Sequence, residues 1–388
     1  MTNRAVRIAG RVVAVSLALA LLGAVAPATA NTTTNSTPLQ HDVDRLHALG
    51  VTGVFARLDT GHGVEVARSG VADLDTRRPV PRDPYLRIGS TTKTYVAVVV
   101  LQLVAEGRLS LSDPVERWLP GVVAGNGNDG RTVTVRQLLQ HTSGLRNYTQ
   151  DLVSNYVTPE TYRQERWRTY TPGELVAMAM SEPPSDTTWA YSNTNYVLAG
   201  MLIEAVTGHG WEREVQDRII RPLGLRHTRT PGTWPFLPAP HATNYQQFTE
   251  GGPLVDTTIA VRGLDSGADG SMVSKAGDLN AFFAALIRGR LLPPAQLAQM
   301  RQMVAIPDGN GYPSGSGDGL GLFYRPLSCG GGYWGHGGNG FGYTIEPAVS
   351  DDGSRRITVS LFTGTIDRDA IAARAGALNS LIDRAICG

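Results

Sequence analysis

A serine and a lysine three residues apart, Ser90 and Lys93, are the pair in this chain best suited to nucleophilic chemistry. Apolar residues follow at helical spacing as far as Ala105, so both side chains should lie on one face of a helix at its first turn. The start of a helix has unpaired backbone N–H groups, and its dipole favours negative charge. A hydroxyl nucleophile, an amine base and a donor to an oxyanion would therefore meet within one turn.

The scarcity of lysine supports this interpretation. Of the 35 basic residues, only Lys93 and Lys275 are lysines, and the rest are arginines. Arginine keeps its proton in proteins, whereas a buried lysine can lose it. Met272 stands three residues before Lys275, so the Ser-x-x-Lys spacing occurs once. The alternative, a surface lysine on an ordinary helix, gives no reason for a lysine at this position.

Two further motifs carry groups that could complete such a site. Tyr191-Ser192-Asn193 precedes an apolar helical pattern and supplies a phenol that can shuttle a proton and an amide that can donate and accept. His336-Gly337-Gly338-Asn339 precedes a strand pattern, and its glycines would let a substrate backbone lie close. Taken alone, the first motif fits a helix-capping turn at least as well, and the second fits a glycine-rich hairpin with an incidental histidine.

Together and in this order, the three motifs resemble those of the penicillin-recognising serine hydrolases. The resemblance is strongest to the branch of class C β-lactamases and secreted actinomycete D-alanyl-D-alanine carboxypeptidases. It covers nearly all of the chain after residue 30. Besides the motifs, it is carried by residues 98–104, His141-Thr142-Ser143-Gly144-Leu145, residues 191–195 and Leu327-Ser328-Cys329-Gly330.

The resemblance implies a role for each matching residue. Ser90 would be the acylated nucleophile, and Lys93 and Tyr191 would share the work of the general base. Asn193 would position the substrate amide, and His336 would line the opposite wall of the cleft.

The resemblance also implies an oxyanion hole formed by the backbone N–H groups of Ser90 and Asn339.

Two departures from the family pattern bear on the substrate. Gly337 stands where the family has a Thr or Ser that helps to hold a substrate carboxylate, and Phe323 stands where the closest DD-peptidases have an arginine for the same purpose. Arg325 lies two residues further, on the same face of a strand, and could substitute. If it does not, an ester or internal D-amide becomes the more plausible substrate.

Strand patterns occur at both ends of the chain and helical patterns fill the middle. We therefore predict an α/β chain of the α+β type, with an antiparallel sheet built from both ends and covered by the terminal helices. Residues 31–95 and 275–388 would form the sheet domain, and residues 96–274 an inserted, mainly helical domain. The resemblance implies the β-lactamase/DD-peptidase fold, with a five-stranded sheet and the catalytic cleft between the domains.

The N-terminus has the layout of a secretory signal: three arginines, an apolar run over residues 12–25, and Ala28-Thr29-Ala30. We predict that residues 1–30 are removed and that the protein is secreted. The alternative is a membrane anchor, but the run is short for a spanning helix, so no stable membrane anchor is expected. Export would place Cys329 and Cys387 where disulfides form, and we expect them to be bonded rather than free thiols. The DD-peptidases that the chain resembles carry such a pair.

Several other classes of function are disfavoured. A net charge of +1 gives no case for nucleic-acid binding. Gly335–Gly340 matches G-x-G-x-x-G by letter, but a strand pattern follows it where a dinucleotide site needs a helix. Neither H-x-x-x-H nor C-x-x-C spacing occurs, so we expect no metal and no cofactor. The chain also lacks the G-x-S-x-G elbow of α/β-hydrolases.

The function expected first is a D-alanyl-D-alanine carboxypeptidase, or a related D-amino-acid peptidase, acting as a monomer on peptidoglycan-derived peptides. The second is an esterase, amidase or β-lactamase on the same scaffold, acting on small esters or amides. In either case β-lactams are expected as covalent ligands. The third is a binding or sensing module that is acylated without turnover, and the intact Tyr191 and Asn193 argue against it.

Overall fold

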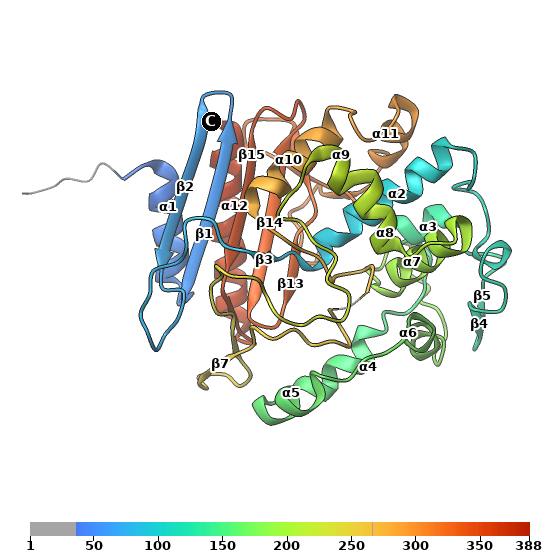
Figure 1. Ribbon diagram of the computed structural model, residues 1–388, viewed down its shortest axis with the longest axis horizontal. Coiled ribbons are helices and arrows are strands. Elements are labelled where there is room, and N and C mark those ends of the chain that lie inside the picture. Colours follow the sequence, from blue (N-terminus) through green and yellow to red (C-terminus); the bar gives the residue numbers. More distant parts are fainter. Residues whose placement is uncertain (1–35, 266) are drawn as a thin grey trace, which may run out of the picture. The chain divides into compact units, whose positions relative to one another are not determined.

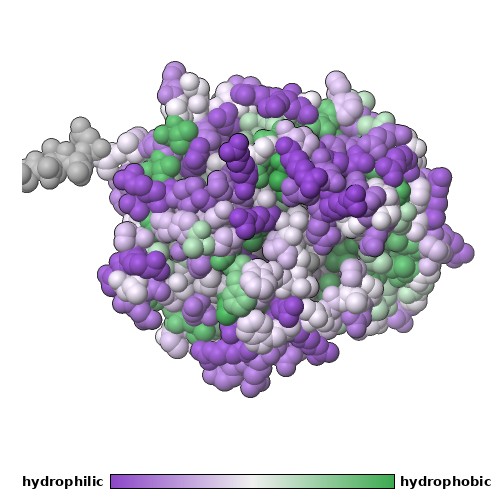
Figure 2. Space-filling model, viewed as in Figure 1, coloured by the Kyte–Doolittle hydropathy of each residue, from purple (hydrophilic) through white to green (hydrophobic). Residues whose placement is uncertain are grey.

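The computed structural model describes residues 36–265 and 267–388, so the signal predicted for residues 1–30 lies outside the described residues. Within the described part, no helix has both the length and the apolar character needed to cross a bilayer. On the face drawn in Figure 2, hydrophilic residues predominate and hydrophobic ones gather in small, separate groups.

The two ends of the chain meet in one antiparallel sheet, as predicted. Strand β1 (Gly53–Thr60) forms a hairpin with β2 (Gly63–Gly70) and pairs on its other edge with β15 (Arg356–Leu361). Beyond β15 the order is β14 (Tyr343–Ser350), β12 (Gly332–Gly335), β11 (Phe323–Pro326), β10 (Gly317–Asp318) and β9 (Val304–Ala305), and β13 (Gly338–Gly340) also pairs with β14. Within the described residues the sheet has nine strands rather than the expected five, because β11, β10 and β9 lengthen it beyond β12 and β13 adds a further pairing to β14.

Helices cover both faces of this sheet (Figure 1). On one face, α1 (Pro38–Ala48) and α12 (Arg368–Cys387) pack on β1, β14 and β15 around a core that includes Val43, Leu46, Ile357 and Ile382. On the other face, α10 (Ala276–Ile287) packs against β14 and β15. Thr37 and Asp367 begin the two terminal helices by accepting hydrogen bonds from backbone N–H groups.

Helix α2 (Thr92–Ala105) runs through the middle of the large core, which explains why its sequence is apolar on all sides. Helices α7 (Thr194–Thr207), α8 (Trp211–Val215) and α11 (Pro294–Met300) pack on it. The remaining elements are α3 (Val135–Leu139), α4 (Thr149–Val153), α5 (Pro159–Glu165), α6 (Pro172–Ala179), α9 (Arg221–Leu223), β3 (Leu86–Arg87), β4 (Ala124–Gly125), β5 (Asn128–Asp129), β6 (Tyr245–Gln247), β7 (Leu254–Asp256), β8 (Val273–Ser274) and β16 (Thr363–Gly364).

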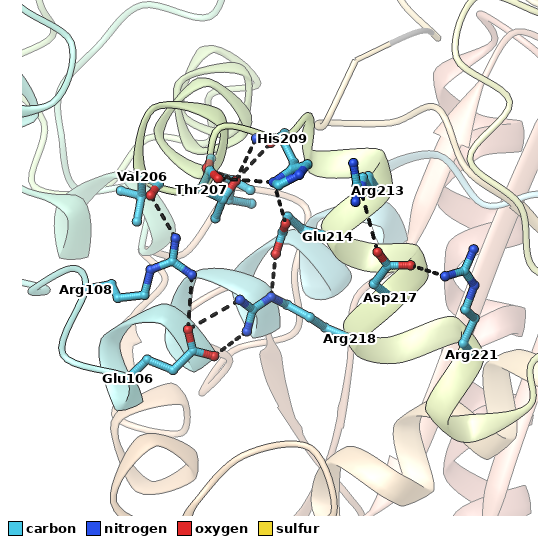
Figure 3. A network of polar contacts seen from close by, with 11 residues as sticks. Glu106, Arg108, Val206, Thr207, His209, Arg213, Glu214, Asp217, Arg218 and Arg221 are labelled. Atoms are coloured by element: carbon cyan, nitrogen blue, oxygen red, sulfur yellow. Dashed lines mark hydrogen bonds and ion pairs between the residues drawn. The ribbon is translucent and has the colours of Figure 1, made fainter.

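A network of charged side chains holds the C-terminal end of α2 (Figure 3). Arg218 pairs with Glu214, at 2.5 Å between Nε and Oε2, and with Glu106, which follows α2 directly. Arg108 pairs with Glu106 and donates to the carbonyl of Val206 at the end of α7. The pair of Arg108 with Glu106 is exposed on both sides, and such a pair contributes at most about 1 kcal/mol. The role of the network is to fix the far end of the helix whose first turn carries Lys93.

Cys329 and Cys387 form a disulfide pair in the structure, with 5.9 Å between their Cα atoms. The pair joins the loop after β11 to the end of α12. Because the bond would close a loop of 58 residues, we expect Cys387→Ser to lower the free energy of unfolding by about 4 kcal/mol under oxidising conditions. Denaturant unfolding with and without reductant checks this, and equal stability of the two proteins without reductant would mean that the bond does not form.

Candidate active site

The Ser90 hydroxyl and the Lys93 amine face each other at the start of α2. A short 3-10 turn, Gly89–Thr91, leads directly into the helix and places the serine at the edge of a cavity. Lys93 Nζ donates to Ser90 Oγ at 2.9 Å. Ser90 is half-buried, whereas Lys93 has no exposed surface. The surface-lysine alternative is therefore wrong, and the Ser90 hydroxyl and the Lys93 amine are in direct contact.

Two further acceptors hold the Lys93 amine. Nζ donates to Asn193 Oδ1 and to the backbone carbonyl of Asp269, both at 2.6 Å. Burial lowers the pKa of Lys93 to about 7, although the negative charge of Asp269 acts in the opposite direction. Near neutral pH, a large share of the molecules therefore carries an uncharged amine that can accept a proton from the serine.

Tyr191 and Asn193 stand beside this pair. Asn193 is the residue before α7, but its side chain makes no capping hydrogen bond and its oxygen faces Lys93 instead. The ring centroid of Tyr191 lies 5.1 Å from Lys93 Nζ. Burial raises the pKa of the Tyr191 phenol well above its ordinary value, and the nearby Ser90 hydroxyl opposes this only in part. The phenol therefore keeps its proton, which suits a donor or shuttle better than a first base.

His141 was not given a role by the sequence, yet it supports this second motif. Its Nδ1 accepts from the backbone N–H of Ser192 at 3.2 Å and lies 3.1 Å from the amide nitrogen of Asn195. Its ring centroid is 4.3 Å from that of Tyr191. His141 is buried with a φ of 54°, in the left-handed region. The motif His141-Thr142-Ser143-Gly144-Leu145 could have indicated that His141 matters. The motif does not show that His141 contacts the distant turn of Ser192.

His336 lines a hollow together with Ser90, Tyr191 and Asn193. Its Nδ1–H donates to the carbonyl of Gly337 at 2.8 Å, and its own carbonyl accepts from Thr91 Oγ1 at 2.7 Å. Its ring centroid is 6.2 Å from that of Tyr191. Burial, reinforced by the charge of Lys93, lowers the pKa of His336 to about 3. The imidazole is therefore neutral, and its Nε2 is a buried acceptor without a partner.

Strand β13 packs tightly against the turn that carries Ser90. A Cβ atom on Gly338 would lie 2.1 Å from the carbonyl oxygen of Ile88 and 3.0 Å from the backbone nitrogen of Ser90. A Cβ on Gly89, whose φ is 47°, would lie 3.2 Å from the backbone nitrogen of Asn339. Ser90 and Asn339 line the same cavity, so the two residues expected to form the oxyanion hole lie together there. Gly338 serves the contact between strand and turn, in addition to any contact with a substrate backbone.

Arg325 lines a larger hollow that also reaches Ser90, and it is already paired. Its Nη1 is 3.0 Å from Glu346 Oε1 and donates to the hydroxyl of Tyr333 at 3.1 Å. Both partners of the ion pair have side chains only 10% exposed. The structure thus brings Arg325 to the cleft that Gly337 also lines, with its charge already balanced by Glu346. Glu346 was missed, although it is the one charged residue of β14, Tyr343–Ser350.

Two connected hollows surround Ser90. The larger, of about 750 Å³, runs past His336 and Arg325 to α12. The smaller, of about 290 Å³, lies toward Asp265 and Phe341. Among residues 36–265 and 267–388, no group of three His, Cys, Asp or Glu side chains is arranged to hold a metal ion.

The Lys93 amine gives the site a predicted pH dependence. With Lys93 as the general base, acylation would need the neutral amine, and burial lowers the pKa of Lys93 to about 7. The acylation rate is therefore expected to rise with pH through about 7 and to level off above it. Stopped-flow acylation by a chromogenic β-lactam between pH 5 and 9 measures this, and a rate that does not change across that interval would exclude Lys93 as the titrating base.

With this geometry in place, comparison with known proteins identifies the family. The Beta-lactamase family model matches residues 40–371. The chain therefore belongs to the family of serine β-lactamases and penicillin-binding proteins, which is a family of serine hydrolases. The large antiparallel sheet with flanking helices is the fold of this family, so the predicted fold class is confirmed.

Among curated relatives, penicillin-binding protein 4 of Amycolatopsis lactamdurans is 33% identical over 162 residues, which is 42% of this chain and 40% of that protein. The chain spans only 34–54% of the length of this and the next two curated relatives. A solved D-stereospecific amidohydrolase from Streptomyces sp. is 40% identical, with a TM-score of 0.80 over 90% of this chain and 98% of that one. The D-amino acid amidase of Ochrobactrum anthropi SV3 is 27% identical, with a TM-score of 0.72 over 88% and 97%.

Proposed function

We propose that this protein hydrolyses amides or esters of D-amino acids through an acyl-enzyme on Ser90. The observation that carries the proposal is the hydrogen bond from a fully buried Lys93 amine to Ser90 Oγ. The neutral amine takes the serine proton while Oγ attacks the carbonyl carbon. The oxyanion is stabilised by the N–H groups of Ser90 and Asn339. The C–N or C–O bond then breaks as the leaving group receives a proton from Lys93 or, through it, from Tyr191.

Deacylation reverses these roles with water as the nucleophile. The neutral amine of Lys93 accepts a proton from water, the hydroxide attacks the ester of Ser90, and Oγ leaves with the returned proton. Asn193 is suited to hold the substrate amide, because its side chain lies at the cavity and keeps its N–H2 for a ligand.

The choice of D-amino acid amides is supported by the two solved relatives, whose names describe a D-stereospecific amidohydrolase and a D-amino acid amidase. The pairing of Arg325 with Glu346 supports the same choice, because the pair has no net positive charge to offer a substrate carboxylate. The test is ammonia release from D- and L-phenylalanine amide by the wild type and by Ser90→Ala. We expect turnover of the D-amide only, and none in the variant. Turnover of neither amide, or an undiminished rate in Ser90→Ala, would overturn the proposal.

A D-alanyl-D-alanine carboxypeptidase is the second candidate, and the penicillin-binding relatives favour it. It requires faster hydrolysis of a D-alanyl-D-alanine peptide than of its C-terminal amide. In both cases we propose that β-lactams acylate Ser90, and that the protein works as a monomer outside the cell after loss of residues 1–30. N-terminal sequencing of the protein recovered from culture medium tests the last point.

A further inference from the structure

The wall of the cleft next to Gly337 contains a buried ion pair that the catalytic steps do not use. Arg325 stands on β11 and Glu346 on β14, and both line the large cavity together with Ser90 and Gly337. The pair therefore lies within reach of a substrate held at the nucleophile.

Glu346 occupies the space that a side chain at position 337 would fill. A Cβ atom built on Gly337 would lie 2.3 Å from Glu346 Oε2 and 3.1 Å from Oε1. Oε1 of Glu346 lies 3.0 Å from Arg325 Nη1. One carboxylate oxygen therefore faces the guanidinium, and the other, Oε2, faces the edge of the cleft at Gly337. A substrate group that extends past Gly337 meets a carboxylate oxygen there.

The positive charge of Arg325 is already balanced by Glu346 within the wall of the cleft. The same Nη1 faces Glu346 and the Tyr333 hydroxyl, the ring of Tyr312 lies 5.4 Å from its Cζ, and its Nε is enclosed without a partner. The pair has no net charge, and an added carboxylate would face Glu346 at close range with no free cation to balance it. A carboxamide or amine, by contrast, can donate a hydrogen bond to Glu346.

We propose that Glu346 is a specificity-determining residue, which selects leaving groups that end in a hydrogen-bond donor and rejects those that end in a carboxylate. This rests on the proposed function, because it places the scissile carbonyl at Ser90. Beyond the proposed function, Glu346 would determine the chemical class of the leaving group.

Binding to a Ser90→Ala protein tests this without any need for turnover. The probes are D-alanyl-D-alanine and its C-terminal amide, measured by isothermal titration calorimetry. We expect the amide to bind at least about tenfold more tightly than the acid. A site that offers a carboxylate no free hydrogen-bond donor discriminates strongly against that charged group. Adding Glu346→Gln removes the negative charge, frees Arg325, and should tighten binding of the acid at least about tenfold.

Controls separate this proposal from the proposed function. Glu160→Gln, at an exposed site on α5, removes the same charge and should leave the preference unchanged. Gly337→Ser should act like Glu346→Gln, because its side chain displaces Glu346. Tighter binding cannot result from misfolding. Equal binding of acid and amide, binding of neither, or an unchanged preference in both variants would overturn the role of Glu346. Ammonia release from D-phenylalanine amide by the wild type judges the proposed function separately.

Discussion

Lys93→Arg is expected to lower the acylation rate by about 100- to 10,000-fold while the protein stays folded. The physical reason is that arginine keeps the positive charge but cannot lose its proton, and a general base contributes a factor of this size. The three acceptors around Nζ, on Ser90, Asn193 and Asp269, can still receive N–H donors from a guanidinium. The rate of Ser90 acylation by a β-lactam, with circular dichroism as the check on folding, measures the effect.

The chain offers a matched control for this substitution. Lys275 is the other lysine. Its Nζ lies 2.7 Å from Asp83 Oδ2, and neither residue lines the cavities around Ser90. Lys275→Arg is expected to leave acylation at the wild-type rate. Wild-type acylation in Lys93→Arg would show that the amine is not the base, and equal losses in both variants would indicate a general effect of the arginines.

Gly338→Ala is expected to reduce turnover by about 100- to 1,000-fold. The new methyl group would lie 2.1 Å from the carbonyl oxygen of Ile88, which is backbone and cannot rotate away. Strand β13 must therefore move from the turn that carries Ser90, which separates the N–H groups of Ser90 and Asn339. Loss of one donor to an oxyanion costs a factor of this size.

The control for this change is Gly376→Ala, on α12. A Cβ there meets nothing within 4 Å, and alanine favours a helix, so activity should be unchanged and stability slightly raised. Turnover numbers from thermally stable preparations decide between them. If Gly338→Ala stayed within a few-fold of the wild type, the contact between β13 and the serine turn would not position the oxyanion donors.

The sequence predicted the parts of the site that lie close together in the chain. The spacing of Ser90 and Lys93, with the scarcity of lysine, was sufficient to place both on one turn of α2. The terminal helices also follow from local periodicity, which reports how a segment is buried. Strands of two residues, such as β9 and β10, are too short to show a pattern.

Long-range contacts could not be predicted, because periodicity does not show which distant elements meet. The carbonyl of Asp269 reaches Lys93 from 176 residues away. His141 holds a turn that starts about 50 residues later in the chain. Arg325 was expected as a possible carboxylate ligand, and only the fold shows that Glu346 on a neighbouring part of the sheet already pairs with it. These are the contacts on which the pKa of the base and the choice of substrate depend.

The central claim is that Ser90 is a nucleophile activated by the neutral Lys93 amine. Incubation with a labelled penicillin, followed by intact-protein and peptide mass spectrometry, tests it most directly. We predict one covalent adduct per chain, located on Ser90, absent from Ser90→Ala and formed far more slowly in Lys93→Arg. An adduct on another residue, or an equal yield of adduct in Ser90→Ala, would contradict the account.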